Sequence, residues 1–466
     1  MMKTNTFRTA FCRFVEGKLF PLVVGEIVLL GHITGLEFYG NMLLFLMFLP
    51  ALCLSDSVRP FLVISLMFIY QVTLRHSPAL PYASTYYFET WRLVVFIILA
   101  AGLVVCLSYY MLRTHLFRDI FRRGVPLLFP LLAFSVSLLL NGAGADGYVW
   151  GNLSFAATQV AVYFFGFFLV WHGLGRENLR DFPDYLMELV HVVAWILIGQ
   201  MLFLLTSRPE VFRDGSLVKE EILFGWGIYN TMGMSLTVLI PLCFYGVLRG
   251  RYRAFSFVTV CALYVSAVLT LSRNALLFGT LALVVSWLVA CFTGLRSSRR
   301  VFRRITLVGI AGVLLLVGVF HRQIFAILND VLQRGLDNNG RFTIWRAAWE
   351  RFLRYPVAGG GFFGVVTEGA YDFASFFPEF AHNTIMEILA ACGIPGFGSY
   401  LWYRVSVLRA FFRRRSQLNT LMLLSLAVLL LESLLDVFAF LLYPMFLAKI
   451  LIAYTLRASE APAGNV

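Results

Sequence analysis

The sequence NALLFGTLALVVSWLVACF at residues 274–292 contains no charged side chain. Such a run crosses a bilayer as a helix, because about 20 apolar residues span the hydrocarbon core and a helix pairs its own backbone polar groups. The chain is therefore predicted to be an all-α, polytopic integral membrane protein with about 14 transmembrane helices. The predicted spans lie near residues 19–34, 41–55, 60–74, 92–111, 125–141, 154–174, 184–206, 227–248, 254–271, 274–292, 305–320, 383–403, 419–435 and 440–456.

The composition of the chain agrees with a membrane protein. Its 466 residues are 60% hydrophobic and 14% charged, with a mean hydropathy of +0.80, whereas soluble domains carry roughly 25% charged residues. The seven cysteines are scattered and no Cys-x-x-Cys spacing occurs, so the sequence supports neither a disulfide framework nor a cysteine metal site. No metal and no cofactor are expected.

The positive charge of the chain, +13, follows from membrane topology. The first 20 residues are basic and lack an apolar core followed by a small-residue cleavage site, so they predict a cytoplasmic lead. When the sides alternate from there, about 25 Lys and Arg residues lie in the cytoplasm and about 12 on the outer side, as the positive-inside rule requires. Both termini are then cytoplasmic, and no nucleic-acid partner is needed to explain the charge.

Three basic regions remain on the outer side: the loop 207–226, the turn at Ser272–Arg273 and the loop 320–383. The last is about 60 residues long, far above the usual connection length, and its helical pattern and bulky aromatics argue against disorder. We expect it to hold short amphipathic helices. Its position suggests three regions, namely N-terminal helices over 1–206, a catalytic region over 207–403, and C-terminal helices with a cytoplasmic tail over 404–466.

The first half of the polar stretch, GRFTIWRAAWERFLRYPVAGGG at 340–361, predicts an amphipathic helix at the membrane surface. Trp345 and Trp349 share one face with Arg341, while Arg346 begins a neighbouring stripe. Interfacial Trp and Arg residues often serve only as anchors. Alternatively, guanidinium groups bind phosphate oxygens in pairs, and aromatic faces bind sugar rings.

The second half, FAHNTIMEILAACGIPG at 380–396, places His382 and Asn383 where the polar loop re-enters the membrane. A lone histidine at a helix start is commonly structural, but here it would meet a substrate at the lipid interface, and histidine titrates near neutral pH. The preceding glycines, including Gly359 and Gly361, allow close backbone approach but lack the Lys-Ser/Thr of a phosphate-binding loop.

Two further features add basic groups on the outer side. Arg273 stands between two spans with almost no loop, a costly position that is usually functional unless the side chain extends to the headgroups. The loop 207–226 carries Arg213 and Lys219, and an aromatic, glycine-rich segment from Phe224 to Asn230 follows it.

Taken in order, these motifs resemble the O-antigen ligase and Wzy-type polysaccharide polymerase superfamily. They are Ser272-Arg273-Asn-Ala, Gly340-Arg341-x-x-x-Trp345, Pro356-x-x-Gly359-x-Gly361, and His382-Asn383 followed by Gly393-x-x-Gly396. The resemblance covers roughly Phe224 to Gly396, and the rest of the chain matches only in hydropathy.

The resemblance implies a GT-C type membrane glycosyltransferase in a bacterial inner membrane. It would move an undecaprenyl-pyrophosphate-linked glycan on the outer face to an acceptor sugar, with inversion and without a metal. His382, Arg273 and Arg341 would be catalytic, whereas the substrate-binding residues would be Asn383, Arg213, Lys219, Trp345, Arg346, Gly359 and Gly361. Membrane lipids surround the protein, and a chain-length regulator could act with it.

One departure concerns an acidic residue that the family often places two positions before the glycine matching Gly393. Here that position holds Ala391, and Glu387 lies a turn earlier.

In the expected chemistry, His382 acts as a general base and removes the proton of the acceptor sugar hydroxyl. Arg273 and Arg341 stabilise the departing pyrophosphate. His382 could instead bind the pyrophosphate. Polymerisation of lipid-linked repeats is favoured slightly over ligation to lipid A core or another acceptor. A lipid-linked glycan flippase is the rival class, although a flippase would be expected to carry charges within several helices and repeat symmetry.

Overall fold

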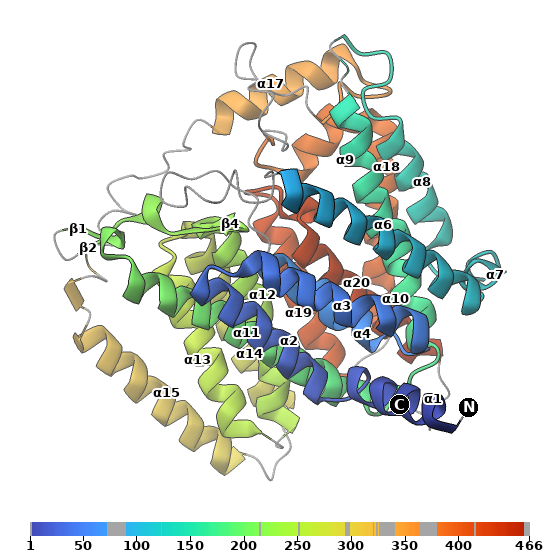
Figure 1. The fold of residues 1–466 in the computed structure, drawn as a ribbon. Helices are drawn as coiled ribbons and strands as arrows, with labels where there is room; N and C mark the ends of the chain where they lie inside the picture. Colours follow the sequence, from blue (N-terminus) through green and yellow to red (C-terminus); the bar gives the residue numbers. More distant parts are fainter. Residues whose placement is uncertain are drawn as a thin grey trace. The chain divides into compact units, whose positions relative to one another are not determined.

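The computed structural model describes residues 2–460 except 72–89, 123, 147, 149, 214–215, 250–251, 294–298, 320, 323–324, 326–340, 363–379 and 414–415. Most of the predicted loop 320–383, including Gly340 of the Gly-Arg motif, therefore lies outside the described residues. The described chain is almost wholly helical (Figure 1). The exceptions are four strands of two residues each in the described part of the 207–228 segment, and we return to them below.

The chain folds as two compact units, each built from separated segments. Unit 1 comprises residues 1–114, 176–335 and 416–428. Its helices are α1 (Met2–Val15), α2 (Leu19–Thr34), α3 (Glu37–Leu54), α4 (Arg59–Met67), α6 (Thr90–Arg113), α11 (Phe182–Ser207), α12 (Tyr229–Arg249), α13 (Arg253–Leu269), α14 (Arg273–Thr293) and α15 (Arg299–Val319), together with most of α19 (Gln417–Glu432).

Unit 2 comprises residues 115–175, 336–415 and 429–466. Its helices are α7 (Leu116–Ile120), α8 (Leu128–Leu139), α9 (Trp150–Val160), a π-helical turn (Ala161–Gly166), α10 (Phe167–Leu174), α17 (Arg341–Arg354), α18 (Thr384–Arg413) and α20 (Leu442–Glu460). A single 3₁₀ turn, Phe438–Phe440, precedes α20.

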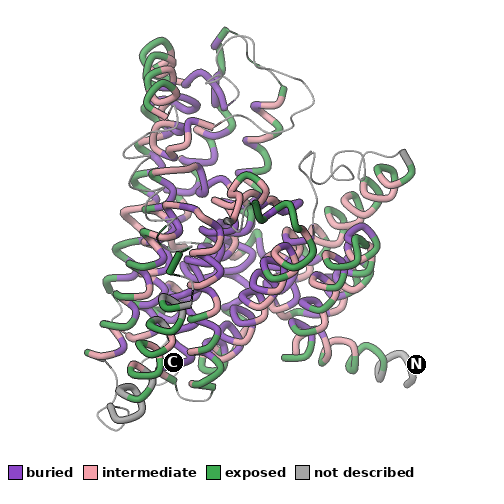
Figure 2. The backbone as a smooth tube through the Cα atoms, turned by 90° about the vertical axis from the view of Figure 1, so that its left-hand side faces the viewer, coloured by how far each residue is buried: buried purple, intermediate pink, exposed green. Residues whose placement is uncertain are grey.

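Helix covers most of the described part of each of the fourteen predicted spans, which confirms the helical fold class. Within the described residues, seven helices are long and apolar enough to cross a membrane, and five shorter apolar helices accompany them. The protein is thus a plausible polytopic membrane protein, while the number of 14 crossings stays a prediction. Many helices mix buried and exposed positions (Figure 2), whereas α10 and most of α12 are buried on all sides.

In unit 1, α12 forms the centre of a tight group with α13 and α14. Gly233 makes this possible, because a Cβ at that position would lie 2.6 Å from the Cβ of Ala275 in α14. The close crossing brings the start of α12 beside the turn that precedes α14. That turn holds Ser272 and Leu271, which has a left-handed backbone with φ 55°, and Arg273 is the first residue of α14.

The loop 207–226, predicted as a basic rim on the outer side, and the two residues after it contain two short antiparallel hairpins. Phe212–Arg213 pairs with Ser216–Leu217, and Leu223–Phe224 pairs with Gly227–Ile228. Trp226 anchors the second hairpin, because its indole N–H donates to Oε1 of Gln200 at 2.9 Å and its ring stands edge-on to Tyr70. Two-residue strands leave no periodic signal in the sequence.

Candidate active site

The backbone around His382 is held in a strained conformation by a buried carboxylate. His382 has φ 49°, a region that side chains with a Cβ rarely adopt. The amide of Ala381, one residue earlier, donates to Oε2 of Glu387 at 2.7 Å. Because Glu387 is fully buried in α18, this bond fixes the chain just before His382. Glu387 thus supports the histidine rather than facing an open site.

The imidazole of His382 contacts Asp436, a residue that the sequence analysis did not single out. Nδ1 of His382 lies 3.2 Å from Oδ1 of Asp436. A carboxylate only accepts hydrogen bonds, so Nδ1 carries a proton, and in the neutral tautomer Nε2 is then the nitrogen with the lone pair. The histidine side chain is 44% exposed and the aspartate 17%. The arrangement presents a ring nitrogen that can accept a proton at an accessible position.

The start of α18 is hydrogen-bonded to the turn that follows α19. The amide of Thr384 donates to the carbonyl of Ser433 at 2.9 Å, and Nδ2 of Asn383 donates to the carbonyl of Leu434 at 2.9 Å. Oδ1 of Asn383 accepts from the amides of Ile385 and Met386, which caps the helix. Asn383 therefore ties two chain segments together, and this positions His382 against Asp436.

The glycine-rich turn is packed against a break in α18. Pro395 has no N–H, which leaves the carbonyl of Ala391 without its helical partner, and the amide of Gly361 fills that place at 3.1 Å. The amide of Gly360 donates to Ala390, and that of Ile394 donates to Pro356. The two segments thereby exchange main-chain hydrogen bonds where helical bonds are lost.

Gly359 and Gly361 are buried in this junction. A Cβ on Gly359 would collide with the backbone of Ala391 and Cys392, and one on Gly361 would collide with the amide group of Asn152. Both glycines have positive φ. The close approach predicted for the glycines occurs, and its partner is protein backbone. A direct contact with substrate stays a prediction.

The loop between α8 and α9 forms the other side of the junction. The amide of Gly142 donates to Ala358 at 2.9 Å, and Oδ1 of Asn141 accepts from the amide of Phe362 at 3.3 Å. The hydroxyl of Tyr355 donates to Oδ2 of Asp146 at 2.9 Å. The sequence analysis missed this loop, although its Asn-Gly and Asp residues are typical of turns that bind backbone.

Four phenylalanine rings lie together near the two ends of the undescribed segment 363–379. Phe155 packs against Phe362 with ring centroids 4.8 Å apart and against Phe380 at 5.7 Å. Phe440 contacts the same two rings at 5.3 and 6.4 Å. The residues at both ends of that segment are thus held by α9 and by the turn before α20.

Helix α17 lies beside the start of α18 and presents the predicted arginines (Figure 1). Ala348 is buried with Ala381 and Ala390, and Ile344 packs against the same group. Arg341 opens the helix and is partly exposed. Arg346 is 82% exposed and pairs with Glu350 at 3.1 Å. Nε1 of Trp345 is buried without a hydrogen-bond acceptor among the described residues.

In unit 1, two of the predicted basic groups stand near the start of α12. Nζ of Lys219 lies 4.3 Å from the ring centre of Tyr229, a cation–π contact. The next residue, Asn230, accepts a 2.8 Å hydrogen bond from Ser272, whose neighbour is Arg273. Arg213 is exposed on the first hairpin. The structure thus brings the 219–230 segment to the Ser272–Arg273 turn.

Residues 257–401 match the family model described as O-antigen ligase. This stretch is an O-antigen ligase family domain. It is of the O-antigen ligase and polymerase type, whose members are membrane glycosyltransferases that transfer lipid-linked glycans. It includes Arg273, Arg341 and His382, whereas Asp436 and the hairpins lie outside it. No curated protein matches the chain.

Within the described residues, no group of three or more His, Cys, Asp or Glu side chains is placed to hold a metal ion.

Proposed function

We propose that the protein polymerises a surface polysaccharide by moving an undecaprenyl-pyrophosphate-linked oligosaccharide onto an acceptor sugar. The observation that carries this proposal is His382, whose Nδ1 faces Asp436 within a domain of the O-antigen ligase family. The acceptor would be a second lipid-linked repeat unit. Ligation of the glycan to lipid A core or another acceptor is the second candidate.

In the proposed reaction, Nε2 of His382 takes the proton from the acceptor hydroxyl. The hydroxyl oxygen forms the new bond to the anomeric carbon from the side opposite the leaving group, so the configuration inverts. The bond from that carbon to the lipid pyrophosphate breaks, and the pyrophosphate leaves with the electron pair. General-base help of this kind contributes about 10²–10⁴-fold in rate.

Arg273 and Arg341 are the proposed partners of the departing pyrophosphate. Its charge grows as the bond breaks, and guanidinium groups stabilise it by paired, charge-assisted hydrogen bonds. Such groups replace a divalent metal in this role, so the proposed reaction needs none. Asp436 is a positioning residue, because its carboxylate orients the ring and stabilises the imidazolium that forms.

The remaining predicted contacts belong to the same proposal. Asn383, Trp345 and Arg346 in unit 2, and Arg213 and Lys219 in unit 1, would bind the sugar and phosphate groups. The buried Nε1 of Trp345 supports its role, because it is a donor with no described acceptor. Gly359 and Gly361 would contribute through the backbone that they shape. The region 207–403 would then be the catalytic part of the chain.

The proposed setting is a bacterial inner membrane, with both termini in the cytoplasm and the active site on the outer face. The donor is then reached from the outer leaflet, and a chain-length regulator would act beside the protein. The counts of Lys and Arg on the two sides support this orientation.

The purified protein with a lipid-linked repeat unit as the only substrate tests the proposal. A ladder of longer lipid-linked chains, unaffected by a chelator, is the expected product. Transfer only after lipid A core is added would identify a ligase. Movement of the lipid-linked repeat across vesicles without any new glycosidic bond would identify a flippase and overturn the proposal.

A further inference from the structure

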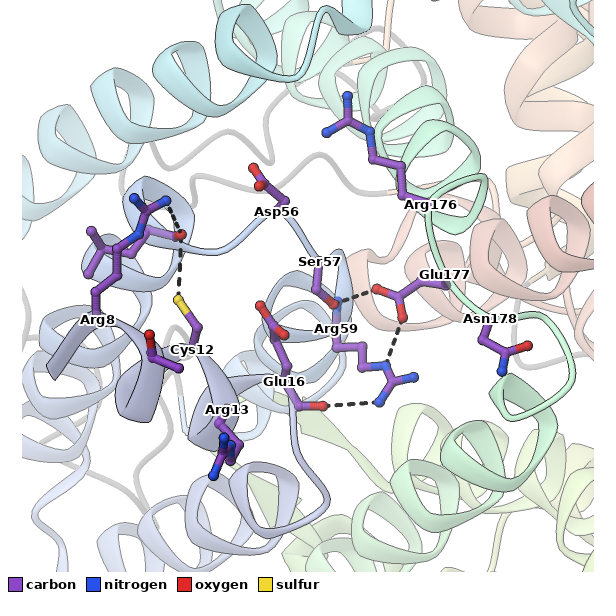
Figure 3. Close-up of a pocket in the computed structure, with 12 residues that line it drawn as sticks. Arg8, Cys12, Arg13, Glu16, Asp56, Ser57, Arg59, Arg176, Glu177 and Asn178 are labelled. Carbon is purple, nitrogen blue, oxygen red and sulfur yellow. Dashed lines mark hydrogen bonds and ion pairs between the residues drawn. The ribbon is translucent and has the colours of Figure 1, made fainter. Parts of the chain in front are cut away.

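A cavity of about 820 Å³ lies in unit 1, and none of the residues proposed above lines it (Figure 3). Three segments surround it, namely α1, the turn between α3 and α4, and the turn that precedes α11. The lining residues are Arg8, Thr9, Cys12, Arg13, Glu16, Leu54, Asp56, Ser57, Arg59, Arg176, Glu177 and Asn178. Four of these twelve carry guanidinium groups, so the cavity is rich in phosphate-binding chemistry.

The carboxylates of the cavity already have partners within the protein. Glu177 accepts from Nε of Arg59 at 2.9 Å and from the hydroxyl of Ser57 (Figure 3). Asp56 pairs with Arg113, which lies outside the cavity lining, at 3.3 Å. Glu16 accepts from the hydroxyl of Ser55 at 2.6 Å. These acids are therefore held in fixed places.

Three of the cavity arginines, unlike Arg59, are not paired with an acidic side chain in the described part of the chain. Arg8 donates to the carbonyl of Leu54, and Arg176 donates to the carbonyl of Thr114. No carboxylate among the described residues pairs with Arg8, Arg13 or Arg176. With Arg113 included, five arginines face three carboxylates, so the cavity keeps a surplus of positive charge. An anion that enters would therefore find guanidinium donors that no acid occupies.

The two faces of helix α1 suggest that the cavity lies at the level of lipid headgroups. Arg8, Cys12 and Glu16 follow each other at helical spacing on the cavity side. Phe7, Phe11 and Phe14 lie on the opposite face, and Phe7 is 69% exposed. A short helix with a basic face and an aromatic face lies in the membrane interface. Its polar side then opens where phosphate groups are concentrated.

Helix α11 separates this cavity from the 207–228 hairpins. The turn at 176–178 precedes the helix, and the hairpins follow it. Its 26 residues rise about 39 Å in total, which exceeds the hydrocarbon thickness. Because α11 is predicted to cross the membrane, we expect the cavity and the hairpins to face opposite sides of it. None of the residues proposed for the transfer reaction lines the cavity.

We propose that this cavity binds a phosphate-bearing anion, held by Arg8, Arg13 and Arg176, at the membrane face opposite the hairpins. Two sources share this chemistry: the headgroup of an anionic phospholipid and a soluble phosphate compound. The guanidinium groups would accept either through charge-assisted hydrogen bonds, and binding would weaken as salt screens the charges.

The test compares the delipidated full-length protein with the combined variant Arg8→Gln, Arg13→Gln and Arg176→Gln. One arm measures binding of inorganic phosphate by calorimetry. The other reconstitutes the protein in phosphatidylcholine vesicles with or without an equal part of phosphatidylglycerol, and counts retained phosphatidylglycerol by native mass spectrometry. The control variant Arg118→Gln, Arg122→Gln and Arg409→Gln removes three exposed arginines outside the cavity.

We expect the cavity variant to lose roughly tenfold or more in affinity for at least one probe, while the control variant keeps wild-type binding. Loss of phosphatidylglycerol alone identifies a headgroup site, and loss of inorganic phosphate alone identifies a soluble ligand. A lysine version at the same three positions should restore part of the binding, which separates charge from misfolding. Equal binding of both probes by the wild-type and cavity-variant proteins would overturn the proposal.

Discussion

His382 shows how far single residues can be predicted from sequence. Its place at the end of a polar loop marked it as a candidate, and the structure places it, half exposed, next to Asp436. Asp436 escaped notice because the contact joins residues 54 positions apart, and no local pattern records such a distance. A usable signal existed, because Asp436 falls between two predicted spans on the same predicted outer face.

Replacement of Asp436 by Asn should lower the maximal transfer rate about tenfold to a hundredfold, because the amide cannot stabilise the imidazolium formed when His382 takes a proton. Steady-state kinetics with varied lipid-linked donor measures the effect. The KM for donor should stay within about twofold, because Asp436 is not among the residues proposed to bind the donor. Asp436→Glu should recover part of the rate. A change confined to KM would contradict a positioning role.

Arg341 and Arg346 provide a matched pair within α17. Arg341→Lys should lower transfer about tenfold or more, because lysine cannot form the paired hydrogen bonds of a guanidinium with pyrophosphate. Arg346→Lys should change the rate less than about threefold, because a single exposed contact of Arg346 with the substrate, shared with Glu350, would keep its charge in the lysine variant. Transfer rates at limiting donor measure both variants. Equal losses of transfer rate in the two variants would contradict this difference and would show that both arginines bind the pyrophosphate.

At the scale of elements, the apolar runs predicted helices well because a bilayer-spanning length is a strong signal. The glycine turn was harder to interpret. Its residues predicted a close backbone approach, but only the structure shows that the partner is the break in α18. Pro395 marks that break in the sequence, and nothing local links it to a turn some 35 residues upstream. The short hairpins had no usable pattern at all.

Gly393→Ala should destabilise the protein. Gly393 has φ 64° and ψ −162°, a conformation that is costly for alanine by about 1–3 kcal/mol. A Cβ there would also lie 2.5 Å from the carbonyl oxygens of Pro356 and Val357. The midpoint of thermal unfolding in detergent should fall clearly. Gly398→Ala in the same helix is the control, because its Cβ would meet nothing within 4 Å; an equal fall in both variants would contradict the junction.

At the scale of the whole molecule, the charge map predicted which side each segment faces, and α11 offers the sharpest test of it. In a cysteine-free background, Glu210→Cys should react with a membrane-impermeant maleimide on intact cells, whereas Arg180→Cys should react only after the cells are opened. Both positions are exposed and α11 lies between them. The reverse pattern of labelling would invert the proposed orientation of the protein.

Transfer by His382 variants on purified lipid-linked substrate tests the central claim most directly. His382→Asn tolerates the left-handed backbone, so a loss of activity in that variant reports on chemistry. His115→Ala is the control, because His115 is also exposed with positive φ, at 59°. We predict that the rate falls about 100-fold or more in His382→Asn and is unchanged in His115→Ala. Full transfer by the His382 variant would contradict its role as the base.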